Sequence, residues 1–179
     1  MRTPLVVRHR RAARVGIGVV ITALIAAISM RVYLTRTSAP SPERMAGVSE
    51  PESEIIKQVN VERVRRGLKA LKFSARLAVV ARGHSLDMAI RRYRDHNTPE
   101  GSTPADRARG MGIECRAVGE NIYVDDYHQL EGLGDRALRG WLGSPEHYGN
   151  LLSPDFVETG IGIAQSSDGL TYVTQDFIR

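Results

Sequence analysis

The spacing of apolar residues divides the C-terminal part of the chain into two regions. Between residues 53 and 141 the apolar residues recur mostly every three or four positions, which is the period of an amphipathic helix. Ser53 opens the first of these patterns and Gly67 ends it, while Ser74 precedes a longer pattern that runs to about Arg92. With a capped short segment after Thr103, the sequence predicts helices over residues 53–66, 74–92, 104–110 and 130–141.

The period changes in the last quarter of the chain. Residues 159–165, TGIGIAQ, and residues 170–177, LTYVTQDF, alternate apolar and polar positions on either side of a Ser-Ser-Asp-Gly turn. This pattern is typical of a β-hairpin, and residues 118–124 are a candidate third strand. Helices that pack on a small antiparallel sheet predict an α+β domain built in layers.

Several polar residues of the predicted helices have an ordinary explanation. His84 lies on the apolar face of the second helix, which favours a buried, hydrogen-bonded histidine over a functional one. Arginines cluster near the ends of the first two helices, where we expect them to be solvated, with attraction to anionic headgroups or wall polymers as the alternative. These arginines are Arg63, Arg65, Arg66, Arg91, Arg92 and Arg94.

The N-terminal part of the chain has the pattern of a membrane-targeting segment. Five arginines precede an uncharged run from Val15 to Met30, whose 16 helical residues cover about 24 Å of a hydrocarbon core of roughly 30 Å. If Arg31 extends its charge to the interface, residues 15–34 reach about 30 Å and span the membrane. We favour an uncleaved anchor over a removed signal peptide, and both place the following domain outside the cytoplasm.

Composition and charge define the remaining organisation. Residues 1–36 form the basic and apolar segment, residues 37–52 are a linker rich in Ser, Pro and Glu, and residues 53–179 form the domain. The net charge of +5 comes from seven arginines within residues 1–40, so residues 41–179 hold 18 basic and 20 acidic residues, a net charge of −2. This balance argues against a nucleic-acid partner. With Cys115 as the only cysteine, the domain has no internal disulfide.

Three polar residues lie in loops or at the ends of predicted elements, where functional groups often occur. They are His96 in RDHNTPEG, Glu120 in GENI and His147 in SPEHYGN. Their separations of 24 and 27 residues match no local metal-binding motif. From the residues alone they are three candidates with no demonstrated meeting point.

The order of several motifs identifies a family. QVNVERVRRGLKALKF is followed by LAVVARGHSLDMA, HNTPEG, VGENIY, WLGSPEHYGNLL, FVETGIGIA and YVTQDF. This succession resembles the CAP superfamily, also called the SCP or pathogenesis-related-1 domain, in its short, cysteine-poor bacterial form. The resemblance covers residues 53–179 and implies the three-layer α-β-α sandwich of that family, in agreement with the layered α+β domain predicted above.

The resemblance also implies a central cleft lined by two histidines and two glutamates that can hold a divalent cation. By motif, His96 and His147 resemble the two histidines and Glu120 resembles the first glutamate. Ser144 stands where many members have the second glutamate, so the set of four is incomplete. Two further polar residues, Asn121 and Asn150, are expected to fix the cleft wall through hydrogen bonds to the backbone.

Two imidazoles and one carboxylate suit a weakly bound divalent cation, zinc before others, with a coordination position left for water. The same three groups without a metal can act as a general base. A hydrogen-bonded cluster that only stabilises the fold is the third possibility.

Three functions follow from these alternatives. The first is a ligand-binding module for a small apolar ligand, such as a lipid or sterol, or for a cell-envelope component. The second is a metal-assisted hydrolase that uses the same cleft, and the third is a non-catalytic interaction protein. The family shares a scaffold more than it shares an activity, so the sequence leaves the ligand and the oligomeric state open.

Overall fold

The structure is a computed structural model that describes residues 47–179. The segment expected to address a membrane, residues 15–34, lies outside these residues. In chain order the elements are α2 (Glu50–Arg65), β1 (Lys72–Phe73), α3 (Ala75–Arg91), α4 (Pro104–Gly110), β2 (Val118–Asp125), α5 (Leu133–Leu142), α6 (Pro145–Leu151), β3 (Glu158–Gln165) and β4 (Thr171–Ile178).

A four-stranded sheet with the order β1-β3-β4-β2 forms the centre of the domain. The predicted hairpin is present as β3 and β4, and β2 pairs antiparallel with β4, so β2 is an edge strand. The prediction of a purely antiparallel sheet is wrong in one respect, because the two-residue strand β1 pairs parallel with β3. So short a strand leaves no alternating pattern from which it could be predicted.

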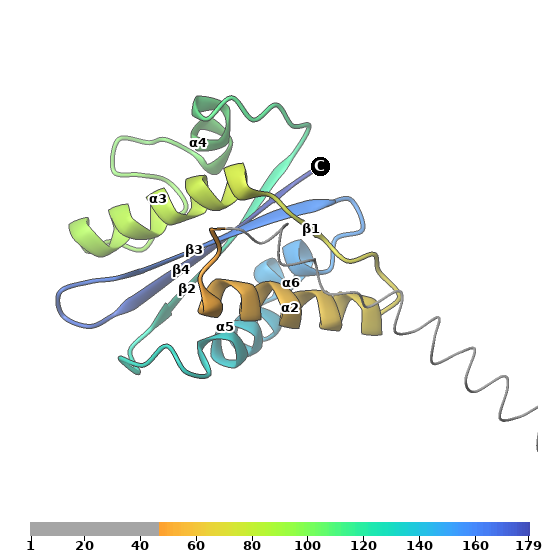
Figure 1. Cartoon of the computed structure of the whole chain (residues 1–179). Coiled ribbons are helices and arrows are strands. Elements are labelled where there is room, and N and C mark those ends of the chain that lie inside the picture. The colour runs from red at the N-terminus through yellow and green to blue at the C-terminus, as the bar shows by residue number, and fades with distance from the viewer. Residues whose placement is uncertain (1–46) are drawn as a thin grey trace, which may run out of the picture. The chain divides into compact units, whose positions relative to one another are not determined.

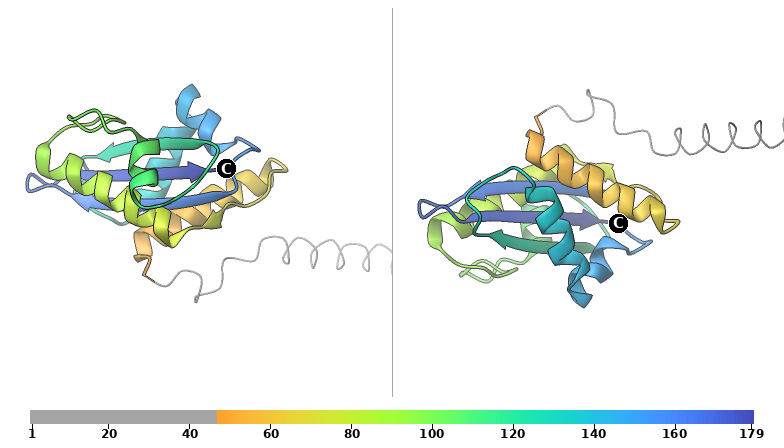
Figure 2. Two further views of the ribbon diagram at one scale, coloured as in Figure 1. Left: turned by 90° about the horizontal axis from the view of Figure 1, so that it is seen from above. Right: turned by 90° about the horizontal axis from the view of Figure 1, so that it is seen from below.

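Helices cover both faces of this sheet, as Figures 1 and 2 show. Helices α3 and α4 lie on one face, and α2, α5 and α6 lie on the other. Gly160 and Gly162 of β3 allow α3 to approach closely, because a Cβ atom at either position would lie within 2.3 Å of a backbone nitrogen of α3. The mixed helix and sheet architecture predicted from the sequence is therefore confirmed.

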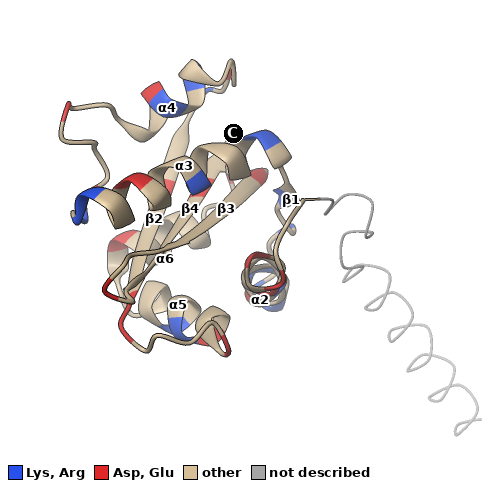
Figure 3. Ribbon diagram, turned by 60° about the vertical axis from the view of Figure 1, so that its left-hand side comes forward, with Lys and Arg blue, Asp and Glu red and all other residues tan. Residues whose placement is uncertain are grey.

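Most charged residues belong to helices and loops, and Figure 3 makes the few carboxylates of the sheet easy to find. Glu120, Asp125 and Asp176 are all buried. Asp125 is neutralised by Arg136, with 2.7 Å between Oδ2 and Nη2. Glu120 and Asp176 belong to the candidate site.

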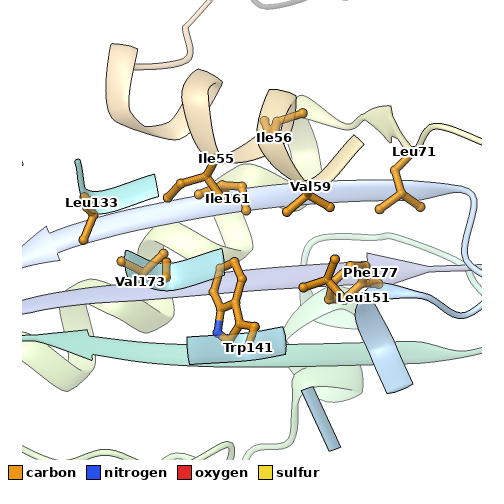
Figure 4. Close-up of a cluster of buried hydrophobic side chains, with 11 residues drawn as sticks. Ile55, Ile56, Val59, Leu71, Leu133, Trp141, Leu151, Ile161, Val173 and Phe177 are labelled. Atoms are coloured by element: carbon orange, nitrogen blue, oxygen red, sulfur yellow. The ribbon is translucent and has the colours of Figure 1, made fainter. Parts of the chain in front are cut away.

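The main hydrophobic core lies between the sheet and the helices α2 and α5 (Figure 4). Trp141 of α5 is fully buried at its centre, next to side chains from α2, β3 and β4. Helix α6 contributes Leu151 to the same core. The cluster contains no disulfide, so burial of apolar surface has to stabilise this half of the domain.

The prediction that Arg63 is solvated is wrong. Its side chain lies on the inner face of α2, and only 1% of the residue is exposed. The guanidinium donates to the backbone carbonyls of Lys69, Leu151 and Ser153 at 2.8 to 3.0 Å. Arg63 therefore joins α2 to the ends of β1 and α6, whereas Arg65 and Arg66 are exposed as expected.

Two helix boundaries and one further helix also differ from the prediction. Helix α2 begins at Glu50 instead of 53, because the Glu52 carboxylate accepts a hydrogen bond from the Ser49 backbone N–H at 2.8 Å and completes the first turn. Helix α5 begins at Leu133 instead of 130. The stretch SPEHYGN, expected to be a loop, forms most of α6, with Ser144 at its N-cap and Pro145 in the first helical position.

Candidate functional site

His96, Glu120 and His147 come together at the outer edge of β2. Glu120 is the third residue of β2 and its side chain is buried, while His96 lies in the loop after α3 and His147 lies on α6. The Nδ1 atom of His96 is 2.8 Å from Oε1 of Glu120. The ring centroids of the two histidines are 6.4 Å apart with the ring planes inclined by 61°, so the edge of one imidazole points toward the other.

Two asparagine side chains join α6 to β2 behind these imidazoles. The Asn150 amide donates to the Glu120 carbonyl and to Oδ1 of Asn121, both at 3.0 Å. The Asn121 amide donates to the His147 carbonyl at 3.1 Å. These three bonds fix the position of His147 relative to Glu120. Ser144 does not line the cleft, because it occupies the N-cap of α6.

A hollow of about 190 Å³ opens between the two imidazoles. Besides the two histidines, Arg94, Asp95 and Ile122 line it. The hydrogen bond to Glu120 raises the pKa of His96 above its usual value. Burial, followed by the nearby charges of His96 and Arg94, lowers the pKa of His147. The hollow therefore contains one imidazole that favours the cationic form and one that favours the neutral form.

Arg107 of α4 was not predicted as a site residue, yet it holds the second oxygen of Glu120. Its Nη2 atom donates to Oε2 of Glu120, and its Nη1 atom donates to the carbonyls of His96 and Ser102 at 2.8 and 3.1 Å. One guanidinium thus neutralises the buried carboxylate and orders the loop that carries His96. No local pattern marks this role, because Arg107 and Glu120 belong to different elements.

His84 lies under the same carboxylate. It is buried, as predicted, and its Nε2 atom donates to the Asp95 carbonyl at 2.9 Å while lying 3.9 Å from Oε1 of Glu120. Burial lowers its pKa and favours the neutral imidazole. Its Nδ1 atom has no hydrogen-bond partner within residues 47–179. His84 therefore satisfies only one of its two ring nitrogens.

Asp176 of β4 is the second residue of the site that was not predicted from the sequence. It is opposite Glu120 in the antiparallel register of β2 and β4, and only 1% of it is exposed. Burial, followed by the adjacent Glu120 carboxylate, raises the pKa of Asp176 well above its usual value. Both effects favour the protonated form of this carboxyl over the ionised form. The sequence did not mark Asp176, because the alternation in residues 170–177 predicts an exposed polar face, whereas β4 is buried along its whole length.

These partners decide whether the site fits a divalent cation. A carboxylate ligand donates a lone pair to the metal, and both Glu120 oxygens already accept hydrogen bonds, one from Arg107 and the other from His96. The guanidinium also supplies a positive charge beside the carboxylate, where a metal would meet repulsion. Within the part of the chain that the structure describes, no group of three or more His, Cys, Asp or Glu residues is arranged to hold a metal. The donor set does not fit zinc.

Comparison with known proteins identifies the family of this fold and site. The profile of the CAP family, described as the cysteine-rich secretory protein family, matches residues 56–177. The chain belongs to the CAP family. The resemblance found in the order of the motifs is thereby confirmed, and the family match includes His96, Glu120 and His147.

The relatives of this CAP domain include two proteins of Bacillus subtilis (strain 168). The protein YkwD is 34% identical over 144 residues, which are 80% of this chain and 51% of YkwD. The membrane protein YlbC is 33% identical over 150 residues, which are 82% of this chain and 40% of YlbC. This CAP chain therefore spans about half the length, or less, of these relatives.

A solved structure supports the same fold. An extracellular protein containing an SCP domain from Bacillus anthracis str. Ames is 31% identical and superimposes with a TM-score of 0.62. The match covers 82% of this CAP chain and 49% of the other protein. Among residues 47–179, no helix is both long enough and apolar enough to cross a membrane.

Proposed function

We propose that this CAP domain is an extracytoplasmic ligand-binding module that holds an acidic group of a cell-envelope component between His96 and His147. The single observation that carries the proposal is that the carboxylate bonded to His96 already has its own cation. Arg107 balances the charge of Glu120, so Asp95 is the one lining carboxylate within residues 47–179 that opposes Arg94 and the cationic form of His96 at the opening. A phosphate or carboxylate is the ligand group that such an opening attracts.

The size of the hollow indicates that one acidic group of the ligand enters it, and not the whole ligand. A volume of about 190 Å³ is below the roughly 300–1,000 Å³ of pockets that enclose drug-sized molecules. We infer that only the acidic group and its nearest atoms enter, while the rest of the ligand lies across the edge of β2. Such a ligand is a phosphate-bearing or carboxylate-bearing part of a lipid or a wall polymer.

We also propose that residues 15–34 tether the domain to the membrane. The supporting observations are the arginines before an uncharged segment and the relatives, which include an extracellular protein and a membrane protein. A domain held in this way meets lipids and wall components at high effective concentration, so weak binding suffices.

Titration of the full chain in detergent tests the binding site. Glycerol phosphate and acetate represent the two acidic groups, and nuclear magnetic resonance follows the ring protons of His96 and His147. We expect both imidazoles to shift with one of these ligands, whereas His128, which bonds the Gly169 carbonyl in a distant turn, stays unchanged. In His147→Ala the shift at His96 should weaken at least severalfold. No shift at either imidazole at millimolar ligand overturns the proposal.

One observation favours a second candidate function, hydrolysis without a metal. Glu120 orients His96 as the carboxylate of a general-base pair does, at a hydrogen-bond distance of 2.8 Å. This function predicts hydrolysis of an ester probe that a chelator does not inhibit and that His96→Ala abolishes. Equal hydrolysis by the wild type and His96→Ala would eliminate it.

A further inference from the structure

The outer face of α3 carries an unusual line of apolar side chains. Val79, Leu86 and Ile90 are 48%, 51% and 69% exposed. With Gly83 between them, these positions are spaced by three or four residues and lie in one row along the helix. The row points away from the sheet, because the opposite side of α3 holds the buried residues. Scattered exposed apolar residues are common in proteins, whereas a continuous row along one helix indicates a contact surface.

A groove beside this row enlarges the apolar surface. It has a volume of about 700 Å³ and runs between α3 and the segment from Thr98 to Met111. Val79 and Val80 form one wall and Met111, which is itself exposed, forms part of the other. The row and the groove together are called the α3 face below.

The charges around the α3 face are mainly positive. Arg76 lies near one end of α3, and Arg92 and Arg94 follow its other end, as Figure 3 shows for the basic residues of this helix. None of these three forms an ion pair with a carboxylate of residues 47–179. The two carboxylates at the groove, Asp87 and Glu100, share the single guanidinium of Arg91 at 2.5 Å, so they leave one negative charge against these three arginines. The surface is therefore complementary to an anionic partner.

The connection to the N-terminal segment lies next to the α3 face. Arg82 of α3 donates to the Gly47 carbonyl at 2.7 Å and pairs with Glu52 at 2.6 Å, so the start of the described chain is fastened to this helix. Only twelve residues lie between Leu34 and Gly47, and this connection can span at most about 45 Å. A membrane that holds residues 15–34 therefore lies within that distance of the attachment point.

We propose that the α3 face docks onto the surface of an anionic membrane, with Val79, Leu86 and Ile90 in the interfacial layer and the arginines at lipid phosphates. This inference rests on the proposed tether, because the tether brings the surface to the membrane. An interfacial helix of this kind combines an apolar row with flanking basic residues. Neighbouring anionic lipids attract such arginines, and salt weakens the attraction.

The experiment uses the full chain reconstituted into vesicles of phosphatidylcholine with or without phosphatidylglycerol. In a Cys115→Ser background, Leu86→Cys carries an environment-sensitive fluorophore, and Val61→Cys on α2, which is exposed to 55%, carries it in the matched control. We expect a blue shift and quenching by brominated lipid for the label at position 86 in vesicles with phosphatidylglycerol, and neither effect at position 61. The substitutions Arg76→Gln, Arg92→Gln and Arg94→Gln together should reduce the quenching at least severalfold.

Flotation of the same vesicles separates the two proposals. A chain that floats with equal signals at positions 86 and 61 retains the tether and overturns the docking of the α3 face. A chain that does not float overturns the tether and the docking together. A blue shift at position 86 that needs a high protein concentration and no lipid identifies a second copy of the chain as the partner, which also overturns the membrane proposal. Thermal unfolding of each labelled variant verifies that it is folded.

Discussion

Glu120 and Asp176 are direct neighbours across the paired strands β2 and β4, and both side chains are buried. Two ionised carboxylates in such a position would repel each other strongly. Two features reduce this repulsion, because Arg107 balances Glu120 and the raised pKa of Asp176 favours its protonated form. The site therefore contains a charged pair beside an acid whose neutral form is favoured.

The raised pKa of Asp176 makes the stability of the domain depend on pH. The folded-state pKa of Asp176 lies above its unfolded value of 3.8, so the native state binds more protons than the unfolded state between these two values. Stability that is present below the unfolded pKa is lost as pH rises through the raised pKa. Asp176→Asn, which remains neutral at every pH, should remove this fall. Urea unfolding at a series of pH values checks it, and identical slopes for both proteins would show that Asp176 is ionised.

Arg107→Ala should strongly destabilise the domain. The substitution leaves the buried Glu120 carboxylate without its cation, and removal of one partner of a buried pair costs about 3–5 kcal/mol. Arg109→Ala on the same helix removes an exposed guanidinium that pairs with Asp106 and should cost far less. The free energies of unfolding of the two variants, measured side by side, test whether Arg107→Ala costs more than Arg109→Ala. Equal losses would mean that the Arg107 ion pair contributes nothing beyond a surface contact.

Zinc should not stabilise the wild-type domain. A specific site saturated at 100 times its Kd would raise the free energy of unfolding by about 2.7 kcal/mol. We expect no such increase, because His96 and Arg107 already occupy both oxygens of Glu120. Thermal unfolding with added zinc and then with a chelator measures this, with His147→Ala as the control for binding at the exposed imidazole. A zinc-dependent rise in Tm that His147→Ala removes would contradict this prediction and support a metal site.

His96 and His147 should titrate at different pH values. The Glu120 carboxylate places the pKa of His96 above 6.5, and burial places the pKa of His147 below 6.5. The stabilising charge on His96 is fully present below its unfolded pKa and is lost as pH rises through the folded value. Ring-proton resonances give both midpoints. In Glu120→Gln the pKa of His96 should decrease, and an unchanged midpoint would show that the 2.8 Å hydrogen bond does not set it.

Some parts of this arrangement follow directly from the sequence. The alternation in residues 159–165 and 170–177 predicted the β3 and β4 hairpin, and the motif order pointed to the three residues that converge at β2. Arg63 could also have been placed correctly, because it follows Ile56 by two helical turns on the same buried face.

Other parts depend on tertiary packing and have no local signal. The contact between Glu120 and Asp176 exists because β2 pairs with β4 and not with β3, which no sequence period specifies. The bond from Arg107 to Glu120 requires α4 to settle against β2 in one orientation. Helix α6 is short, and its residues have too few turns to display a helical period.

The guanidinium of Arg107 gives the site a cation that belongs to the chain itself. Chelators cannot remove it, competing ions cannot replace it, and its charge persists at every physiological pH. In the extracytoplasmic location that we propose for this domain, the cell does not regulate the metal content of the surroundings. Because the Arg107 guanidinium supplies the positive charge, this CAP domain would keep the same site in metal-poor and metal-rich surroundings.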